Sequence, residues 1–132
     1  MGILNAVEGA MERWIDLAWS KVHPRQQQGA VVSILRRECD ERALILERGR
    51  TVVPNSFTVE LPRQSHARLA PEEPQLGLFL AHEVHRHAAE QGYSFAGPVA
   101  VDLRPAQEAV PGRFRILSRI TPAATADRHR RP

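Results

Sequence analysis

The densest group of potentially reactive side chains lies at residues 82–87, which read His-Glu-Val-His-Arg-His. Two histidines four residues apart on one helical face, with a glutamate after the first, form the zinc site of many metalloproteases. The segment lacks this spacing, because position 86 is an arginine. His82 and His85 could still share a helical face, with His66 as a third ligand if the fold brings it close. We favour histidines without a metal, and we expect no metal and no other cofactor.

The sequence contains no other recognisable catalytic set. It has neither a glycine-rich phosphate loop nor a nucleophile elbow. The single cysteine, Cys39, excludes an internal disulfide and a zinc site built from several cysteines of this chain. We therefore expect a protein without enzymatic activity.

A second group of interest consists of arginines on predicted strands. Alternation places several of them on one face of a sheet, where they can bind phosphates or acidic partners. Glu60 and Asp102 are expected on the same face and can instead hold the arginines in cross-strand ion pairs. Sheets that bind RNA also expose aromatic side chains, and Phe114 is expected on the opposite face. We therefore rank a protein partner above nucleic acid. The candidate partner-binding face comprises Arg104, Arg113, Arg115 and Arg119.

Length and charge point to an ordinary globular domain. The chain has 132 residues, of which 42% are apolar, and a formal net charge of +3. The last six residues contain three arginines and one aspartate. The net charge of the rest of the chain is therefore close to zero. No apolar run approaches the ~20 residues that a transmembrane helix needs. The first residues also lack the features of a signal peptide, so we expect a cytoplasmic protein that reaches the membrane only through its partners.

Hydrophobic periodicity predicts the elements that position these residues. Apolar residues at three- and four-residue spacing indicate helices, and strict alternation indicates strands. Trp14 falls in the buried stripe of the first helix, and Glu38 on the solvated face of the second, which Gly49 would close. The predicted helices cover residues 3–22, 26–47 and 72–91, with a short helical turn at 65–69. The predicted strands cover residues 56–61, 99–104 and 113–120.

The predicted order is α-α-β-α-β-β, which gives an α/β (α+β) fold with a small three-stranded mixed sheet and helices packed on one face. The first two strands should be parallel and joined by a right-handed crossover, and the last two should form a long hairpin. We expect one globular domain over residues 1–120, followed by a flexible tail or the start of a linker over 121–132. Thr121 and Thr125 lie in that tail and are candidate phosphoacceptors.

Several segments resemble one known family. The most specific is Gly-Arg-Thr-Val-Val-Pro-Asn-Ser-Phe over residues 49–57, and residues 35–40, 90–99 and 112–119 are also similar. Together they resemble the N-terminal domain of actinobacterial FhaA-type proteins, which are regulators that carry a C-terminal forkhead-associated (FHA) domain. The resemblance covers roughly residues 1–120.

The resemblance implies a non-enzymatic signalling adaptor that acts through protein–protein interaction. Proteins of this type work downstream of Ser/Thr protein kinases and are tied to peptidoglycan synthesis and cell division. The implied partners are therefore a Ser/Thr kinase and components of the cell-wall or division machinery. The alternative is a nucleic-acid-binding domain that uses the arginine-bearing face of the sheet.

Overall fold

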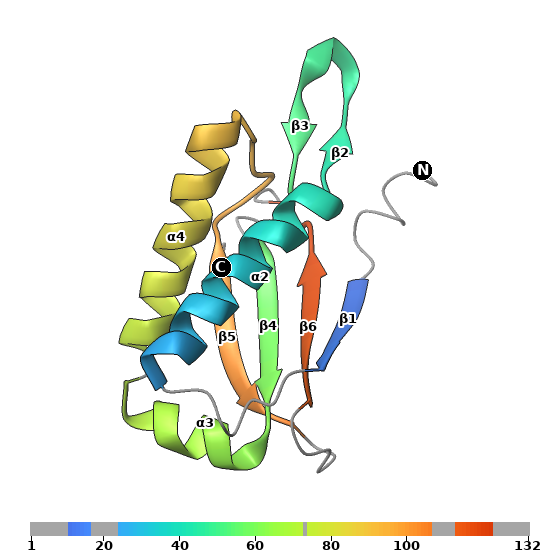
Figure 1. Cartoon of the computed structure of the whole chain (residues 1–132). Coiled ribbons are helices and arrows are strands. Elements are labelled where there is room, and N and C mark those ends of the chain that lie inside the picture. The colour runs from blue at the N-terminus through green and yellow to red at the C-terminus, as the bar shows by residue number, and fades with distance from the viewer. Residues whose placement is uncertain (1–10, 17–23, 73, 107–112, 123–132) are drawn as a thin grey trace, which may run out of the picture.

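The computed structural model describes residues 11–16, 24–72, 74–106 and 113–122 (Figure 1). Three α-helices lie in these residues: α2 (Pro24–Glu41), α3 (Arg63–Leu69) and α4 (Gln75–Gln91). The strands are β1 (Met11–Asp16), β2 (Leu44–Ile45), β3 (Thr51–Val52), β4 (Ser56–Leu61), β5 (Ala100–Pro105) and β6 (Arg113–Arg119). None of the described helices is long and apolar enough to cross a membrane.

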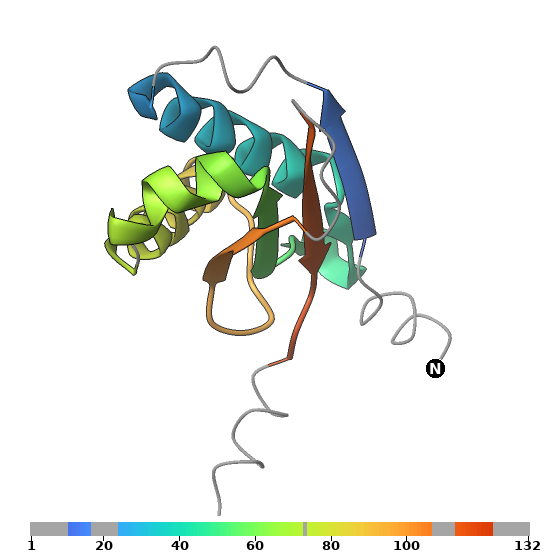
Figure 2. The same ribbon diagram turned by 90° about the horizontal axis from the view of Figure 1, so that it is seen from below.

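The main sheet has four strands in the order β1-β6-β4-β5. Strands β4 and β5 are parallel, whereas β6 runs antiparallel to both β4 and β1. The helices α2, α3 and α4 lie on the same side of this sheet (Figure 2). The α/β class, the mixed sheet and the helices on one face are therefore confirmed.

The alternating segments of the sequence form the strands that were expected from them. Strand β4 covers residues 56–61 as predicted, and its buried side chains are Phe57, Val59 and Leu61. They pack beneath α2 and α4, which contribute Leu35 and Leu80 among others to the core. Helix α4 ends at Gly92, whose φ of 76° is a left-handed conformation that glycine adopts without strain.

The prediction of a helix over residues 3–22 is wrong for its central part. Residues 11–16 form β1, an edge strand paired with β6, in which Trp14 lies opposite Arg115. Residues 3–10 and 17–22 of the predicted helix lie outside the described residues. The helical spacing of Met11 and Trp14 misled the prediction, because pairing with β6 overrides a local pattern of so few residues.

The second helix ends earlier than predicted. Helix α2 stops at Glu41, and strands β2 and β3 then form a small antiparallel hairpin that projects beyond the main sheet (Figure 1). Gly49 does not cap the helix but lies in the turn of this hairpin, with φ of 71° next to Arg48 at 65°. Ile45, which lies within the predicted helix, is 75% exposed in β2.

The expected hairpin between the last two strands is also wrong, and the sheet has four strands instead of three. Strand β6 pairs with β4 and β1, which leaves β5 at the edge of the sheet. The inward side chains Phe114 and Ile116 of β6 are completely buried, whereas Val101 and Leu103 of β5 retain slight exposure. The strand with the larger inward side chains thus takes the central position beside β4.

Candidate functional site

The side of the sheet opposite the helices carries the candidate site. Alternation along each strand directs one set of side chains into the core and the other set to this side. No described helix covers it (Figure 2). We call it the open face; it comprises Glu12, Trp14, Thr58, Glu60, Asp102, Arg104, Arg115, Leu117 and Arg119.

Arg115 is the centre of the open face and is held by two carboxylates. Its Nη2 atom lies 2.6 Å from Oε1 of Glu60, and its Nη1 atom lies 3.1 Å from Oε2 of Glu12. The guanidinium carbon is 5.2 Å from the centre of the Trp14 ring, a cation–π distance. Arg115 is therefore already occupied by partners from β1 and β4.

The other arginines of the predicted face differ from Arg115. Arg104 is 65% exposed on β5, and its only ion-pair contact within the described residues is 3.9 Å to Asp102. Arg119 is exposed near the end of β6 and has no ion-pair partner in the described part of the chain. The backbone of Arg113 begins β6, but its side chain lies outside the described residues. Arg104 and Arg119 are thus the cations available to a partner.

The described side chains of the open face carry balanced charge. Among them, three arginines, at positions 104, 115 and 119, lie with the three carboxylates Glu12, Glu60 and Asp102. A surface that binds nucleic acid normally has a clear excess of positive charge, because phosphate neutralisation supplies most of the affinity. A face with charges of both signs can instead be complementary to a partner protein whose surface also carries both signs.

Trp14 is a residue of the open face that the sequence reasoning missed. It is 43% exposed, and its indole N–H donates to Glu12 over 2.8 Å. An aromatic side chain therefore lies beside the arginines, although none was expected there. Only knowledge that residues 11–16 form a strand could have revealed it, because its spacing from Met11 also fits the stripe of a helix.

The histidines of α4 have separate surroundings. His82 and His85 are exposed, and the ring of His85 packs edge-on against Phe95 with centroids 5.1 Å apart. His87 is buried, and its Nε2 lies 2.8 Å from Oδ1 of Asp40 on α2. Across the described residues, no group of three or more His, Cys, Asp or Glu side chains is arranged to hold a metal ion.

Cys39 is a core residue. It is fully buried on α2, and burial, followed by the nearby charges of Asp40 and Glu38, raises the pKa of its thiol to about 12. The thiolate that a nucleophile or metal ligand needs is therefore strongly disfavoured.

Asn55 has a structural role within residues 49–57, the segment in which the family resemblance is most specific. Its buried side-chain amide donates to the carbonyl oxygens of Pro98 (2.9 Å) and Thr121 (3.1 Å), and its Oδ1 accepts from the Thr121 N–H (2.8 Å). It thus ties the beginning of β4 to the segments before β5 and after β6. Thr121, a candidate phosphoacceptor, is half-buried at this junction, and Thr125 lies outside the described residues.

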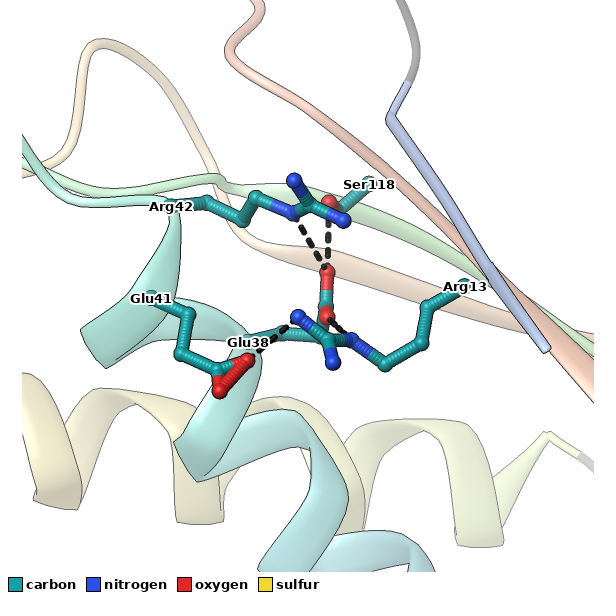
Figure 3. Close-up of polar contacts among 5 residues, drawn as sticks. All are labelled: Arg13, Glu38, Glu41, Arg42 and Ser118. Atoms are coloured by element: carbon teal, nitrogen blue, oxygen red, sulfur yellow. Dashed lines mark hydrogen bonds and ion pairs between the residues drawn. The ribbon is translucent and has the colours of Figure 1, made fainter. Parts of the chain in front are cut away.

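A second polar cluster lies on the helix side of the sheet (Figure 3). Glu38 of α2 is fully buried, and its Oε1 accepts from Arg13 of β1. Its Oε2 accepts from Ser118 Oγ of β6 at 3.1 Å and from Arg42 Nε at 3.4 Å. The hydrogen bond to Glu38 raises the pKa of Arg13. The prediction that Glu38 is solvated is wrong; it anchors the edge strand β1 to α2.

Fold and site together define a small α/β domain with one helix-covered face and one open face of balanced charge. The family model described as "FhaA, N-terminal domain" matches residues 4–117. The chain belongs to the FhaA N-terminal domain family. This confirms the resemblance seen in the sequence and the assignment as the N-terminal domain of an FHA-type protein.

A solved structure provides an independent comparison of the fold. The structure described as "Rv0020c_Nter structure" is 24% identical to this chain, with a TM-score of 0.65. The match covers 78% of this chain and 75% of that chain. No match was found among curated protein sequences.

Proposed function

We propose that this domain is a non-enzymatic adaptor that acts through protein–protein contact at its open face. The observation that carries the proposal is the balanced charge of that face, with Arg104 and Arg119 exposed beside Asp102 and the Arg115–Glu60 pair. The implied context is that of the family resemblance: FHA-type signalling downstream of Ser/Thr kinases in cell-wall synthesis and division. In this proposal the domain works in the cytoplasm and reaches the membrane through its partners.

The test is a capture from nuclease-treated lysate on the immobilised domain, with an Arg104→Ala/Arg119→Ala variant beside it. Both arginines are exposed, so the variant should keep its fold. The matched control is Arg37→Ala/Arg68→Ala, which removes two exposed arginines from the helix side. A protein retained by the parent and the control but lost in the open-face variant supports the proposal. Retention that is equal in all three contradicts it.

The alternative function, nucleic-acid binding, is supported by one observation, the exposed Trp14 beside Arg115. Stacking of bases on an aromatic ring between arginines is a common mode of single-strand recognition. It predicts that a labelled single-stranded oligonucleotide binds with a steep salt dependence, which Arg104→Ala/Arg119→Ala flattens by about 1.4 in log–log slope. Binding that is undetectable at low salt removes this alternative.

A further inference from the structure

A groove runs between helix α4 and the edge strand β5. It encloses about 360 Å³. One wall is a stripe of small and apolar residues on one side of the N-terminal half of α4, at the spacing of successive helical turns. The other wall is the strand itself, from Val99 to Arg104. The helical wall consists of Pro74, Gly77, Leu78 and Ala81.

The strand wall of the groove offers unpaired main-chain groups. The amides of Ala100 and Ala106 donate to carbonyls on the β4 side, at 2.8 and 2.7 Å. In a parallel pair, alternate residues direct both N–H and C=O to the same neighbour. Val101 and Leu103 therefore direct theirs away from β4, to the edge where no strand of the described residues pairs with β5. The Val101 carbonyl lies against Gly77 of α4, so Leu103 is the residue whose main-chain groups a partner can use.

The helix approaches this edge closely at Gly77. A Cβ atom on Gly77 would lie 2.9 Å from the Val101 carbonyl oxygen, so only glycine permits this approach. Further along the strand, Leu103 and Arg104 line the groove. Leu78 projects over it and is 70% exposed, an apolar side chain without a covering partner among the described residues.

We propose that an extended segment of a partner polypeptide adds to β5 as a further antiparallel strand in this groove. Strand addition to a sheet edge takes its affinity from main-chain hydrogen bonds, and its specificity from pockets for alternate side chains. An apolar side chain opposite Leu103 would enter the groove against Leu78 and Ala81. This surface adjoins the open face and shares Asp102 and Arg104 with it at the edge of the sheet.

Charge defines the segment that fits. Asp102 and Arg104 flank Leu103, point to the open face and are about equally exposed. The complementary antiparallel strand carries an acidic residue opposite Arg104, an apolar residue opposite Leu103 and a basic residue opposite Asp102. A second copy of β5 would match these charges, but its own Leu103 is buried in its own core and could not fill the groove.

The probe is the blocked peptide Ac-Thr-Val-Glu-Val-Lys-Val-Thr-NH2, titrated into the isotope-labelled domain and followed by NMR. We expect saturable binding, with the largest amide shift at Leu103. Leu78→Asp should weaken binding at least about tenfold, which corresponds to the loss of one buried apolar contact. The neighbouring Phe79→Ala is the matched control, because Phe79 is also exposed but does not line the groove.

Two further measurements separate strand addition from other modes. Methylation of the amide nitrogens that face β5 should abolish binding while every side chain of the peptide is kept. Arg104→Glu should prefer a peptide in which lysine replaces the glutamate. The proposal is overturned by an absence of saturable binding at about 1 mM, or by insensitivity to amide methylation. It is also overturned by a dimer of the domain that Leu78→Asp dissociates. Arg119→Ala leaves the groove intact, so failure of the open face and failure of the groove are distinguishable.

Discussion

The two faces of the main sheet use the same residue types to opposite effect. On the helix side, Glu38 is completely buried and binds Arg13, Arg42 and Ser118 (Figure 3). On the open face, Arg115 binds Glu60 and Glu12, and all three side chains keep some contact with solvent. Burial, not the number of ion pairs, separates a structural anchor from a surface that remains available to partners.

The buried carboxylate of Glu38 and the partly exposed carboxylate of Glu60 should respond differently when a partner is lost. A buried charge without its partners cannot be rehydrated, whereas an exposed one exchanges its partner for water at little cost. The helix-side cluster should therefore tolerate little change. The open face can rearrange its ion pairs on binding without loss of the fold.

The largest expected effect comes from Glu38→Ala. It leaves Arg13, Arg42 and Ser118 without their shared acceptor and removes the link between α2 and the edge strand β1. We expect a loss of about 3–5 kcal/mol in the free energy of unfolding, because three hydrogen bonds to a buried charged acceptor are lost together and the deleted side chain leaves a cavity. Urea denaturation measures it as a lower midpoint with an unchanged slope.

Glu41→Ala is the matched control, because Glu41 also binds Arg13 but is 44% exposed. It should cost under about 1 kcal/mol. If both variants lose the same stability, burial does not decide how strongly an ion pair stabilises this fold.

The next largest effect is expected at Asn55, and it tests whether a hydrogen-bond network without charged groups also stabilises the fold. Asn55→Ala removes three side-chain hydrogen bonds at the junction of β4, Pro98 and Thr121 and leaves the partly buried backbone groups of Pro98 and Thr121 without these partners. We expect a loss of about 2–3 kcal/mol, measured in the same denaturation experiment. Ser33→Ala provides the baseline, because Ser33 is exposed on α2 and takes no part in the hydrogen bonds of Asn55. A loss below that of Glu41→Ala would show that the neutral network contributes little.

The sequence predicts the elements that follow one clear period. Strand β4 alternates without exception, and α4 keeps its apolar stripe from Leu76 to Ala88, so both were predicted with nearly correct bounds. Glu38 could not be recognised as buried, because its neighbours are charged. Its burial depends on Arg13, which arrives from a distant strand.

The open face was predictable only in part. Alternation alone placed Arg104, Arg115 and Arg119 on one side of their strands. The partners of Arg115 depend on strand order, which local pattern does not fix: Glu12 and Trp14 reach it because β6 lies between β1 and β4. The groove beside β5 exists for the same reason, since the expected hairpin would have covered that edge.

An intermediate effect is expected where a polar cluster is only partly buried, at Asp40, His87 and Tyr93. The hydrogen bond to Asp40 raises the pKa of Tyr93 to about 12. Burial acts to raise the pKa of Asp40, but the hydrogen bonds from Tyr93 and His87 outweigh it and lower that pKa. The stability from Tyr93 should therefore be complete below pH ~10 and be lost as the pH rises towards 12. The stability from Asp40 should be present above pH ~4 and be lost as the pH falls.

Tyr93 is the only tyrosine of the chain, so the ultraviolet absorbance of tyrosinate reports its titration directly. We expect a midpoint near 12 in the native protein. Asp40→Ala should move it down towards the ordinary value of about 10. The control Asp102→Ala, on the open face, should leave the midpoint in place. An equal midpoint in all three proteins would contradict the role given to Asp40.

The smallest effect should come from the open face itself. Glu60→Gln removes one of the two carboxylates of Arg115, but Arg115 keeps Glu12 and its stacking on Trp14. We expect a loss below about 1 kcal/mol at low salt. It should shrink further at about 1 M salt, where the screening length falls to about 3 Å. The loss caused by Glu38→Ala should hardly change under the same conditions, because the Glu38 carboxylate is completely buried and salt screens buried pairs much less. Urea denaturation of both variants at the two salt concentrations measures this difference in salt dependence. A loss for Glu60→Gln that is large and independent of salt would mean that the open face is structural and not free to bind.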